Sequence, residues 1–277
     1  MGLASAAASP LRLKDTLPIR LKQPLFQSIF CFFGLSDQLP HSGKGEVIIK
    51  ATQDHMLHLS STLSKLLKRR FGKGPETCYV NGDEEKIYIF MRNFITPAEE
   101  VLLGNKQWEI AIHFRTAIIE AVIKEFSFEI SKTLDQSYTN FYHDWNYEKN
   151  TGMILLVNGK ANVEERLPLG TKNGILAMID KIGSHFHKRP ENLTILKYAP
   201  SICIIEADGI MAPLENLVYQ MGNMNLLNRY SESAKKGYFE HKLSLEDVFN
   251  RIIEDIFIMW DYQNDKSFLV FTFRKEM

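Results

Sequence analysis

The stretch Arg69–Leu102, RRFGKGPETCYVNGDEEKIYIFMRNFITPAEEVL, decides the fold because its plan returns one domain later, from Ser184 to Leu217. In each stretch a helix ends, two short apolar strands follow, and a proline close to an acidic residue opens the next helix. In the first stretch Thr96 is a natural N-cap, Pro97 takes the first helical position and Glu99 the third, which is a capping box. The pattern therefore predicts a repeated unit of helix, two strands and helix.

Periodicity extends this unit in both directions. The elements expected in the first copy are a helix over Glu46–Phe71, strands over Thr77–Val80 and Lys86–Met91, a short helix from Pro97 to Leu103, a long helix over about Lys106–Leu134, and strands over about Ser137–Tyr147 and Met153–Val157. Asn81-Gly82 is the pair that a tight hairpin turn prefers, so it is expected to join the first two strands. The apolar side of the long helix is expected at Ile110, Phe114, Ile118, Val122 and Phe126.

A shift of 115 positions superimposes the two copies without a gap. It pairs Phe71 with Phe186, Pro75 with Pro190, Glu76 with Glu191, Ile87 with Ile202, Ile89 with Ile204, Ile95 with Ile210, Glu100 with Glu215, Leu102 with Leu217, Trp145 with Trp260 and Tyr147 with Tyr262. A single offset that holds for so many identities predicts a tandem duplication. In the second copy Ala199-Pro200-Ser201 is expected to replace the first hairpin turn, and Gly237 to interrupt the long helix before a fresh start near Ser244.

The predicted fold class is α+β, with two homologous domains joined about a pseudo-twofold axis. Each domain is expected to run helix-strand-strand-helix-helix-strand-strand, with a small antiparallel sheet packed by helices. The expected boundaries are a poorly ordered leader at residues 1–45, the first domain at 46–159, a linker at 160–169 and the second, diverged domain at 170–277.

Composition excludes several classes of protein. The chain has 277 residues, of which 45% are hydrophobic and 24% charged, as in a globular protein. Lysine plus arginine and aspartate plus glutamate both number 33, so the chain carries no net charge, which argues against nucleic acid as a partner. Cys31, Cys78 and Cys203 are too few and too scattered for a disulfide framework or a thiolate metal site, which fits a reducing, cytoplasmic location. No apolar run reaches the roughly 18–20 residues that a membrane-spanning helix requires.

A basic cluster is the candidate binding site. Arg69, Arg70 and Lys73 lie beside two glycines, and together with Arg92 they could hold a small anion, including a nucleotide, through exposed amides and guanidinium groups. Basic side chains at a helix C-terminus followed by glycine are also ordinary capping, and the cluster follows a helix instead of preceding one. The capping interpretation is favoured, and the anion site is kept as the alternative.

Other clusters are expected to be structural. Asp54, His55 and His58 share one helix without a third and fourth metal ligand, so a solvated face is favoured and no metal site is predicted. Two aromatic rows alternate along strands and are expected to pack in the core more than to stack on single-stranded nucleic acid: Phe141, His143, Trp145 and Tyr147 in the first copy, and Ile258, Trp260 and Tyr262 in the second. No catalytic set and no cofactor-binding motif is found, so we expect a protein that is not an enzyme.

Two motifs resemble a known family. Phe71-Gly-x-Gly-Pro75 and Thr96-Pro97-Ala-Glu99 are similar to those of the MpsC-type family, a bacterial domain labelled as a component of a sodium-translocating, membrane-potential-generating system. The resemblance covers residues 47–158 well and 170–277 more loosely. The second copy keeps Phe186 and Pro190 without the glycines, and its second motif becomes Met211-Ala-Pro213-Leu-Glu215.

The resemblance implies a cytosolic accessory or regulatory protein of a membrane ion-transport system, in a Gram-positive bacterium. The first functional hypothesis is therefore a non-enzymatic protein that acts beside a sodium or bicarbonate transporter, with a subunit of that system as its partner. The second is an anion- or nucleotide-sensing module built on Arg69, Arg70, Lys73 and Arg92. A homo-oligomer is compatible with either.

Overall fold

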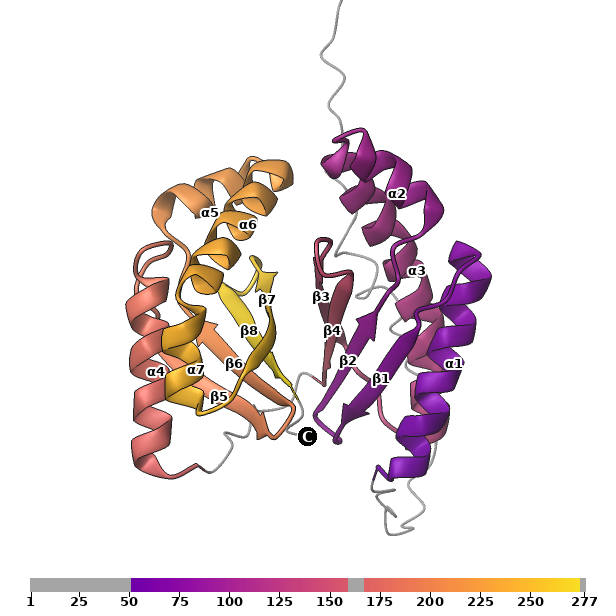
Figure 1. Cartoon of the computed structure of the whole chain (residues 1–277), viewed down its shortest axis with the longest axis horizontal. Helices are drawn as coiled ribbons and strands as arrows, with labels where there is room; N and C mark the ends of the chain where they lie inside the picture. Colours follow the sequence, from indigo (N-terminus) through magenta and orange to yellow (C-terminus); the bar gives the residue numbers. More distant parts are fainter. Residues whose placement is uncertain (1–50, 159–166, 275–277) are drawn as a thin grey trace, which may run out of the picture. The chain divides into compact units, whose positions relative to one another are not determined.

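The first half of the chain forms a four-stranded antiparallel sheet with helices on one face (Figure 1). The computed structural model describes residues 51–158 and 167–274. The elements of the first half are α1 (Gln53–Phe71), β1 (Thr77–Gly82), β2 (Lys86–Arg92), α2 (Pro97–Gly104), α3 (Trp108–Leu134), β3 (Asn140–Asn146) and β4 (Thr151–Val157). Their sheet order is β1-β2-β4-β3.

The second half repeats this plan. Its elements are α4 (Leu169–Gly183), β5 (Asn192–Ala199), β6 (Ile202–Asp208), α5 (Pro213–Gln220), α6 (Met224–Glu240), α7 (Lys242–Phe249), β7 (Ile253–Asp261) and β8 (Lys266–Phe273). The sheet order β5-β6-β8-β7 is equivalent to that of the first sheet, element by element. The predicted fold class, two α+β units with antiparallel sheets packed by helices, is confirmed.

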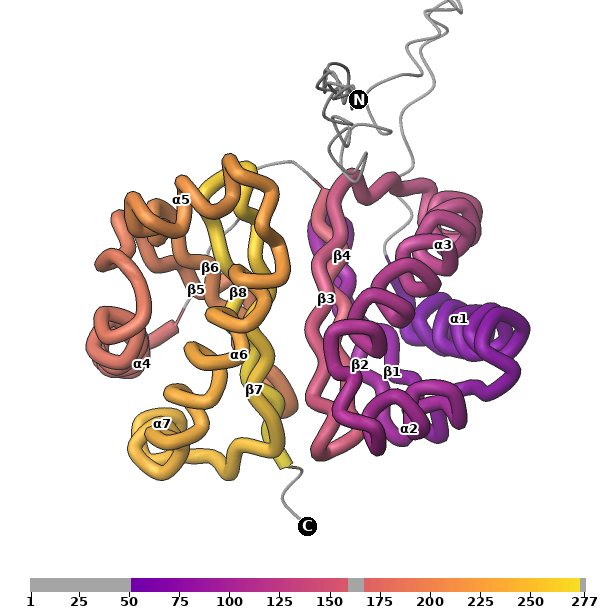
Figure 2. The backbone as a smooth tube through the Cα atoms, turned by 90° about the horizontal axis from the view of Figure 1, so that it is seen from above, coloured from indigo at the N-terminus to yellow at the C-terminus, as the bar shows by residue number. Residues whose placement is uncertain are grey.

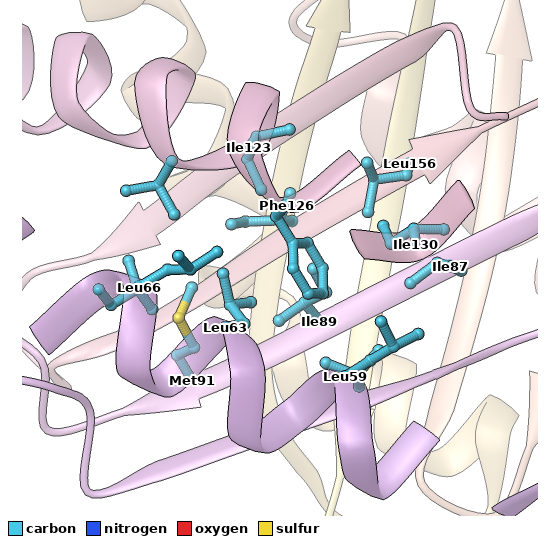
Figure 3. Close-up of a cluster of buried hydrophobic side chains, with 14 of the residues drawn as sticks. Leu59, Leu63, Leu66, Ile87, Ile89, Met91, Ile123, Phe126, Ile130 and Leu156 are labelled. Carbon is cyan, nitrogen blue, oxygen red and sulfur yellow. The ribbon is translucent and has the colours of Figure 1, made fainter. Parts of the chain in front are cut away.

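A hydrophobic core lies between the helices and the sheet of the first half. Helices α1 and α3 lie side by side over the same face of this sheet (Figure 2). Figure 3 shows three leucines of α1 (Leu59, Leu63 and Leu66) facing β2 residues Ile87, Ile89 and Met91, with Phe126 of α3 between them. Alternate residues of β2 thus face the helices, which is the period expected of a strand.

The opposite faces of the two sheets pack against each other. A second-face cluster joins residues of both halves: Tyr88, Met153, Leu155, Val157, Leu196, Ile202, Ile204, Phe257, Met259, Phe268 and Val270. Ring contacts bridge the sheets, with centroids 6.2 Å apart for Phe90 and Phe257 and 4.8 Å apart for Tyr142 and Phe268. Strands β3 and β7, which are equivalent, contact each other. The pseudo-twofold axis itself stays a prediction.

Buried polar groups also join the halves. The hydroxyl of Tyr142 donates to Asp261 at 2.6 Å, and the side-chain amide of Asn146 donates to Asp255 at 2.9 Å. Asp144 accepts from the ammonium of Lys235 at 2.9 Å. Because buried carboxylates are costly unless they are paired, these contacts help fix how one sheet sits on the other.

The equivalence between the halves is not the ungapped shift of 115 positions. Leu196 forms a bulge in β5 opposite β6, which adds one residue, so equivalent residues are 116 positions apart from β6 into α6. By the end of α7 the shift is 115 again, because Asp135 and Asn250 are the left-handed C-caps of α3 and α7. The break between α6 and α7 at His241 lies within this stretch. Capping shows the shift directly, because Glu99 and Glu215 both occupy the third position of their helices.

Five of the predicted residue pairs are therefore wrong by one position, namely Ile87 with Ile202, Ile89 with Ile204, Ile95 with Ile210, Glu100 with Glu215 and Leu102 with Leu217. A slip of one residue exchanges the two faces of a strand. Ile87 faces the helices, whereas Ile202 faces the other sheet, and the residue that corresponds to Ile87 is Cys203. The pairs outside this segment, including Trp145 with Trp260, keep the shift of 115.

Two local predictions are also corrected. Asn81-Gly82 is the end of strand β1, paired with β2, and not the turn. The turn lies at residues 83–85, where the carboxylate of Asp83 accepts the backbone N–H groups of Glu85 and Lys86 at 3.0 Å each. The hairpin turn predicted near Pro200 does separate β5 from β6.

Gly237 lies inside α6 and does not end it, because the helix continues to Glu240. A Cβ atom at this position would lie 1.9 Å from Cζ of Phe186, so the glycine makes room for that ring. The predicted interruption of the long helix is confirmed, but it falls at His241. The predicted leader at 1–45 and most of the linker at 160–169 lie outside the described residues.

Candidate functional site

A buried ion pair holds the start of α2 against α3 in the first half. Glu99 caps its own helix, because its Oε2 accepts the backbone N–H of Thr96 at 2.9 Å and the Thr96 hydroxyl at 2.8 Å. Arg115 of α3 reaches the same carboxylate twice, with Nε 2.5 Å from Oε1 and a terminal nitrogen 2.6 Å from Oε2. The two residues are 2% and 0% exposed. A forked pair of this kind is the strongest form of charged hydrogen bond.

Aromatic rings enclose the guanidinium group of Arg115. Its Cζ lies 4.3 Å from the ring centroid of Trp145 and 5.0 Å from that of Phe94. A terminal nitrogen also donates to the carbonyl oxygen of Phe94 at 3.1 Å. The charge of Arg115 is thus compensated by a carboxylate, a carbonyl and ring faces, so the first half holds a permanent cation beside its capping glutamate.

His143 completes this cluster as a neutral acceptor. The indole N–H of Trp145 donates to Nδ1 of His143 at 3.1 Å. Burial, and to a smaller extent the charge of Arg115, lowers the pKa of His143 to about 4. Near neutral pH the ring therefore carries no charge and can accept the bond.

The equivalent position in the second half lacks the arginine. Glu215 caps α5 in the same way, with Oε2 accepting the backbone N–H of Ala212 at 2.6 Å. Ser231 of α6 takes the place of Arg115, and its hydroxyl accepts the indole N–H of Trp260 at 2.7 Å. Oε1 of Glu215 has no hydrogen-bond partner among the residues that the structure describes.

In the second half, the imidazole of His187 takes the position that corresponds to the guanidinium group of Arg115. His187, from the segment after α4, contacts the ring of Trp260 edge to face at 4.9 Å. Its Nδ1 lies 4.0 Å from Oε1 of Glu215, and within the described part of the chain this nitrogen has no hydrogen-bond partner either. Burial lowers the pKa of His187 to about 4, and burial raises the pKa of Glu215. The second half therefore holds a carboxylate whose cation is not permanent.

The residues of the predicted anion site have protein partners. Arg69 and Arg70 both contact the carboxylate of Glu125 on α3, and the pKa of Glu125 is lowered chiefly by its hydrogen bond from Arg69. Lys73 donates to the carbonyl oxygen of Ile95 at 2.8 Å, and Arg92 pairs with Glu254 of the second half. The structure thus brings Arg69 and Arg70 together and gives Lys73 and Arg92 separate partners. The anion site stays a prediction, and an anion there would compete with Glu125.

The remaining candidates have structural roles. His55 completes the capping box of α1 with Thr52, whereas Asp54 and His58 are exposed. Burial raises the pKa of the Cys78 thiol to about 11, which makes it a poor nucleophile. Trp145 belongs to the core between the helices and the sheet of the first half, and Trp260 packs against the corresponding core of the second half. The prediction that the aromatic rows pack in the core is confirmed.

Sequence reasoning did not place Arg115 or His187 in a site, and it named Glu215 only as part of the repeat and of the second motif. The predicted apolar side of α3 began at Ile110 and Phe114, but both are exposed, and the buried side runs through Ala111, Arg115 and Ile119. A cation on the buried side of an apolar helix was the available signal, since such a charge requires a partner.

The fold and site together define an α+β protein of two similar halves, each with a short helix capped by a buried glutamate. Residues 52–159, the first half, match the model of the family described as Na+-translocating membrane potential-generating system (MpsC). No curated protein and no solved structure matches the chain. Over residues 51–158 and 167–274, no helix is both long enough and apolar enough to cross a membrane.

Proposed function

We propose that this chain is a non-enzymatic accessory or regulatory protein of a membrane ion-transport system, and that it acts from the cytoplasmic side on a sodium or bicarbonate transporter. The observation that carries the proposal is the family match over residues 52–159, whose description names a sodium-translocating system. The partner is a subunit of that system. The second half is a diverged duplicate of the first, as its equivalent strand order supports. It differs from the first in the residues around the capping glutamate.

The first half exposes apolar side chains where a partner can reach them. Ile110 and Phe114, one turn apart on the same face of α3, are 54% and 37% exposed. Large exposed apolar side chains that lie close together are common at protein contacts. Because the family match covers this half, the contact with the transport system is expected here.

Purification of the tagged full-length chain from detergent-solubilised membranes of the organism that encodes it tests the proposal. We expect subunits of an ion-transport system to be enriched, and we expect deletion of the gene to lower sodium tolerance. The variant Ile110→Ala/Phe114→Ala should lose the enrichment. The matched variant Leu243→Ala/Ile252→Ala, which removes two exposed apolar side chains from the second half, should keep it.

Recovery of no transport subunit, combined with unchanged sodium tolerance after deletion, would contradict the proposal. Loss of enrichment only in the second-half variant would move the contact away from the half that the family model matches.

A further inference from the structure

The two halves compensate the charge of a buried carboxylate in different ways. Each buries a helix-capping carboxylate, Glu99 or Glu215, and a buried carboxylate is unfavourable unless a positive charge or a proton compensates it. In the first half Arg115 supplies the compensation permanently. In the second half Ser231 replaces that arginine, and His187 stands where the first half has Gly72.

In the second half, two buried polar atoms face each other without a hydrogen bond between them. The side chains of His187 and Glu215 are 6% and 9% exposed, and their facing atoms, Nδ1 and Oε1, are 4.0 Å apart. That separation is too long for a hydrogen bond. Both atoms are without a hydrogen-bond partner within residues 51–158 and 167–274.

We propose that His187 and Glu215 together bind one proton, which closes the 4.0 Å gap into a hydrogen bond and fastens the start of α5 to the segment after α4. The proton can reside on the imidazole, which makes an ion pair like that of Arg115 and Glu99, or on the carboxyl group, which then donates to Nδ1. Either arrangement removes the isolated buried charge. The proton belongs to the pair and not to one residue.

Other titratable groups face this pair from the elements packed around it. Tyr230 of α6 and Tyr262 of β7 have raised pKa values, chiefly because they are buried and further because of the charge of Glu215, so both stay neutral at physiological pH. Asp265, in the turn between β7 and β8, is negative and raises the pKa of Glu215 further. These neighbours favour uptake of a proton, because they add negative charge or leave the charge unchanged.

The consequence is that the second half responds to pH where the first half does not. A carboxyl group whose pKa is raised by burial destabilises the folded state at pH values above that pKa, and the cost disappears as the pH falls and the group is protonated. The lowered pKa of His187 acts in the opposite sense between about pH 6.5 and pH 4, because in this range the imidazole gains a proton when it is unfolded and not when it is buried. Above about pH 6.5, where that contribution is absent, α5 should be held more firmly as the pH falls.

Matched glutamine substitutions in the full chain test this proposal. Glu215→Gln imitates the protonated carboxyl group, because its amide can donate to His187 while its oxygen still accepts from Ala212. We expect it to raise the midpoint of thermal unfolding by about 2–4 °C at pH 8.5, an effect that should be much smaller at pH 5. Glu99→Gln is the control, since it leaves Arg115 without its carboxylate and should lower the midpoint at both pH values.

Nitrogen NMR of the imidazole side chains is the second readout. The signal of His187, assigned as the one absent from a His187→Gln variant, should shift with pH in the wild type along a curve that changes in Glu215→Gln. Equal destabilisation by Glu215→Gln at both pH values would overturn the proposal. A His187 titration that is the same with and without Glu215 would also overturn it.

Discussion

Replacement of Arg115 by methionine is expected to lower the free energy of unfolding by about 3–5 kcal/mol, because it leaves the carboxylate of Glu99 buried without a cation. Both side chains are fully buried, and the carboxylate receives two bonds from the guanidinium group. Methionine fills a similar volume, so the loss reports the missing charge more than a cavity. Urea unfolding followed by circular dichroism measures it.

The double variant Glu99→Gln/Arg115→Met separates the charge from the packing. Removing both members of a buried ion pair is often nearly neutral, whereas removing one is costly. The glutamine oxygen can still cap α2 at Thr96, so the double variant is expected to recover most of the lost stability. A single variant that loses less than about 1 kcal/mol would mean that water reaches Glu99 and compensates its charge.

Phe257→Ala is expected to cost a similar amount, about 3–5 kcal/mol. Phe257 lies on β7, is fully buried, and belongs to the cluster that joins the two sheets. Its ring meets that of Phe90 on β2, so the truncation opens a cavity that both halves line. Urea unfolding should show the loss as a shift of one transition, because the two halves share this core.

Ile252→Ala is the matched control for that variant. Ile252 lies one residue before β7 and its side chain is exposed, so its truncation should change stability by no more than about 0.5 kcal/mol. A loss confined to the second half, with the first half unfolding at an unchanged urea concentration, would contradict the shared core.

Local chemistry made part of this fold predictable. The capping box of Thr96 and Glu99 was predictable because its residues are three positions apart and interact within one turn. The turn at Asn81-Gly82 was not, because pairing with β2 extended β1 through both residues and moved the turn to Asp83. The local preference for a turn was overridden by the strand ladder.

Packing between the sheets was harder to foresee. Strand β4 is buried on both faces along its whole length, and such strands have continuous apolar sequences, as Met153–Val157 does. This signal was present, but a single sequence does not say what covers the second face. The bulge at Leu196 was hidden for a similar reason, because a one-residue shift preserves the apolar character of β6 while exchanging its faces.

The site itself depended on contacts distant in sequence. Arg115 and Glu99 are joined across two helices, and His187 meets Glu215 only because the segment after α4 lies beside the start of α5. The predicted basic cluster, by contrast, used neighbours in sequence, and Arg69 and Arg70 do lie together. Spacing rules find groups on one element, whereas charge compensation between elements requires the fold.

The two halves share one scaffold and differ in whether the capping glutamate has a permanent cation. Amide hydrogen exchange of the full chain at pH 6.5 and pH 8, corrected for the intrinsic dependence of exchange on pH, tests this most directly, with α2 as the internal control for α5. We expect the opening free energy of α2 to be the same at both pH values and that of α5 to be lower at pH 8. An equal response of the two helices, or a response of α2 alone, would contradict it.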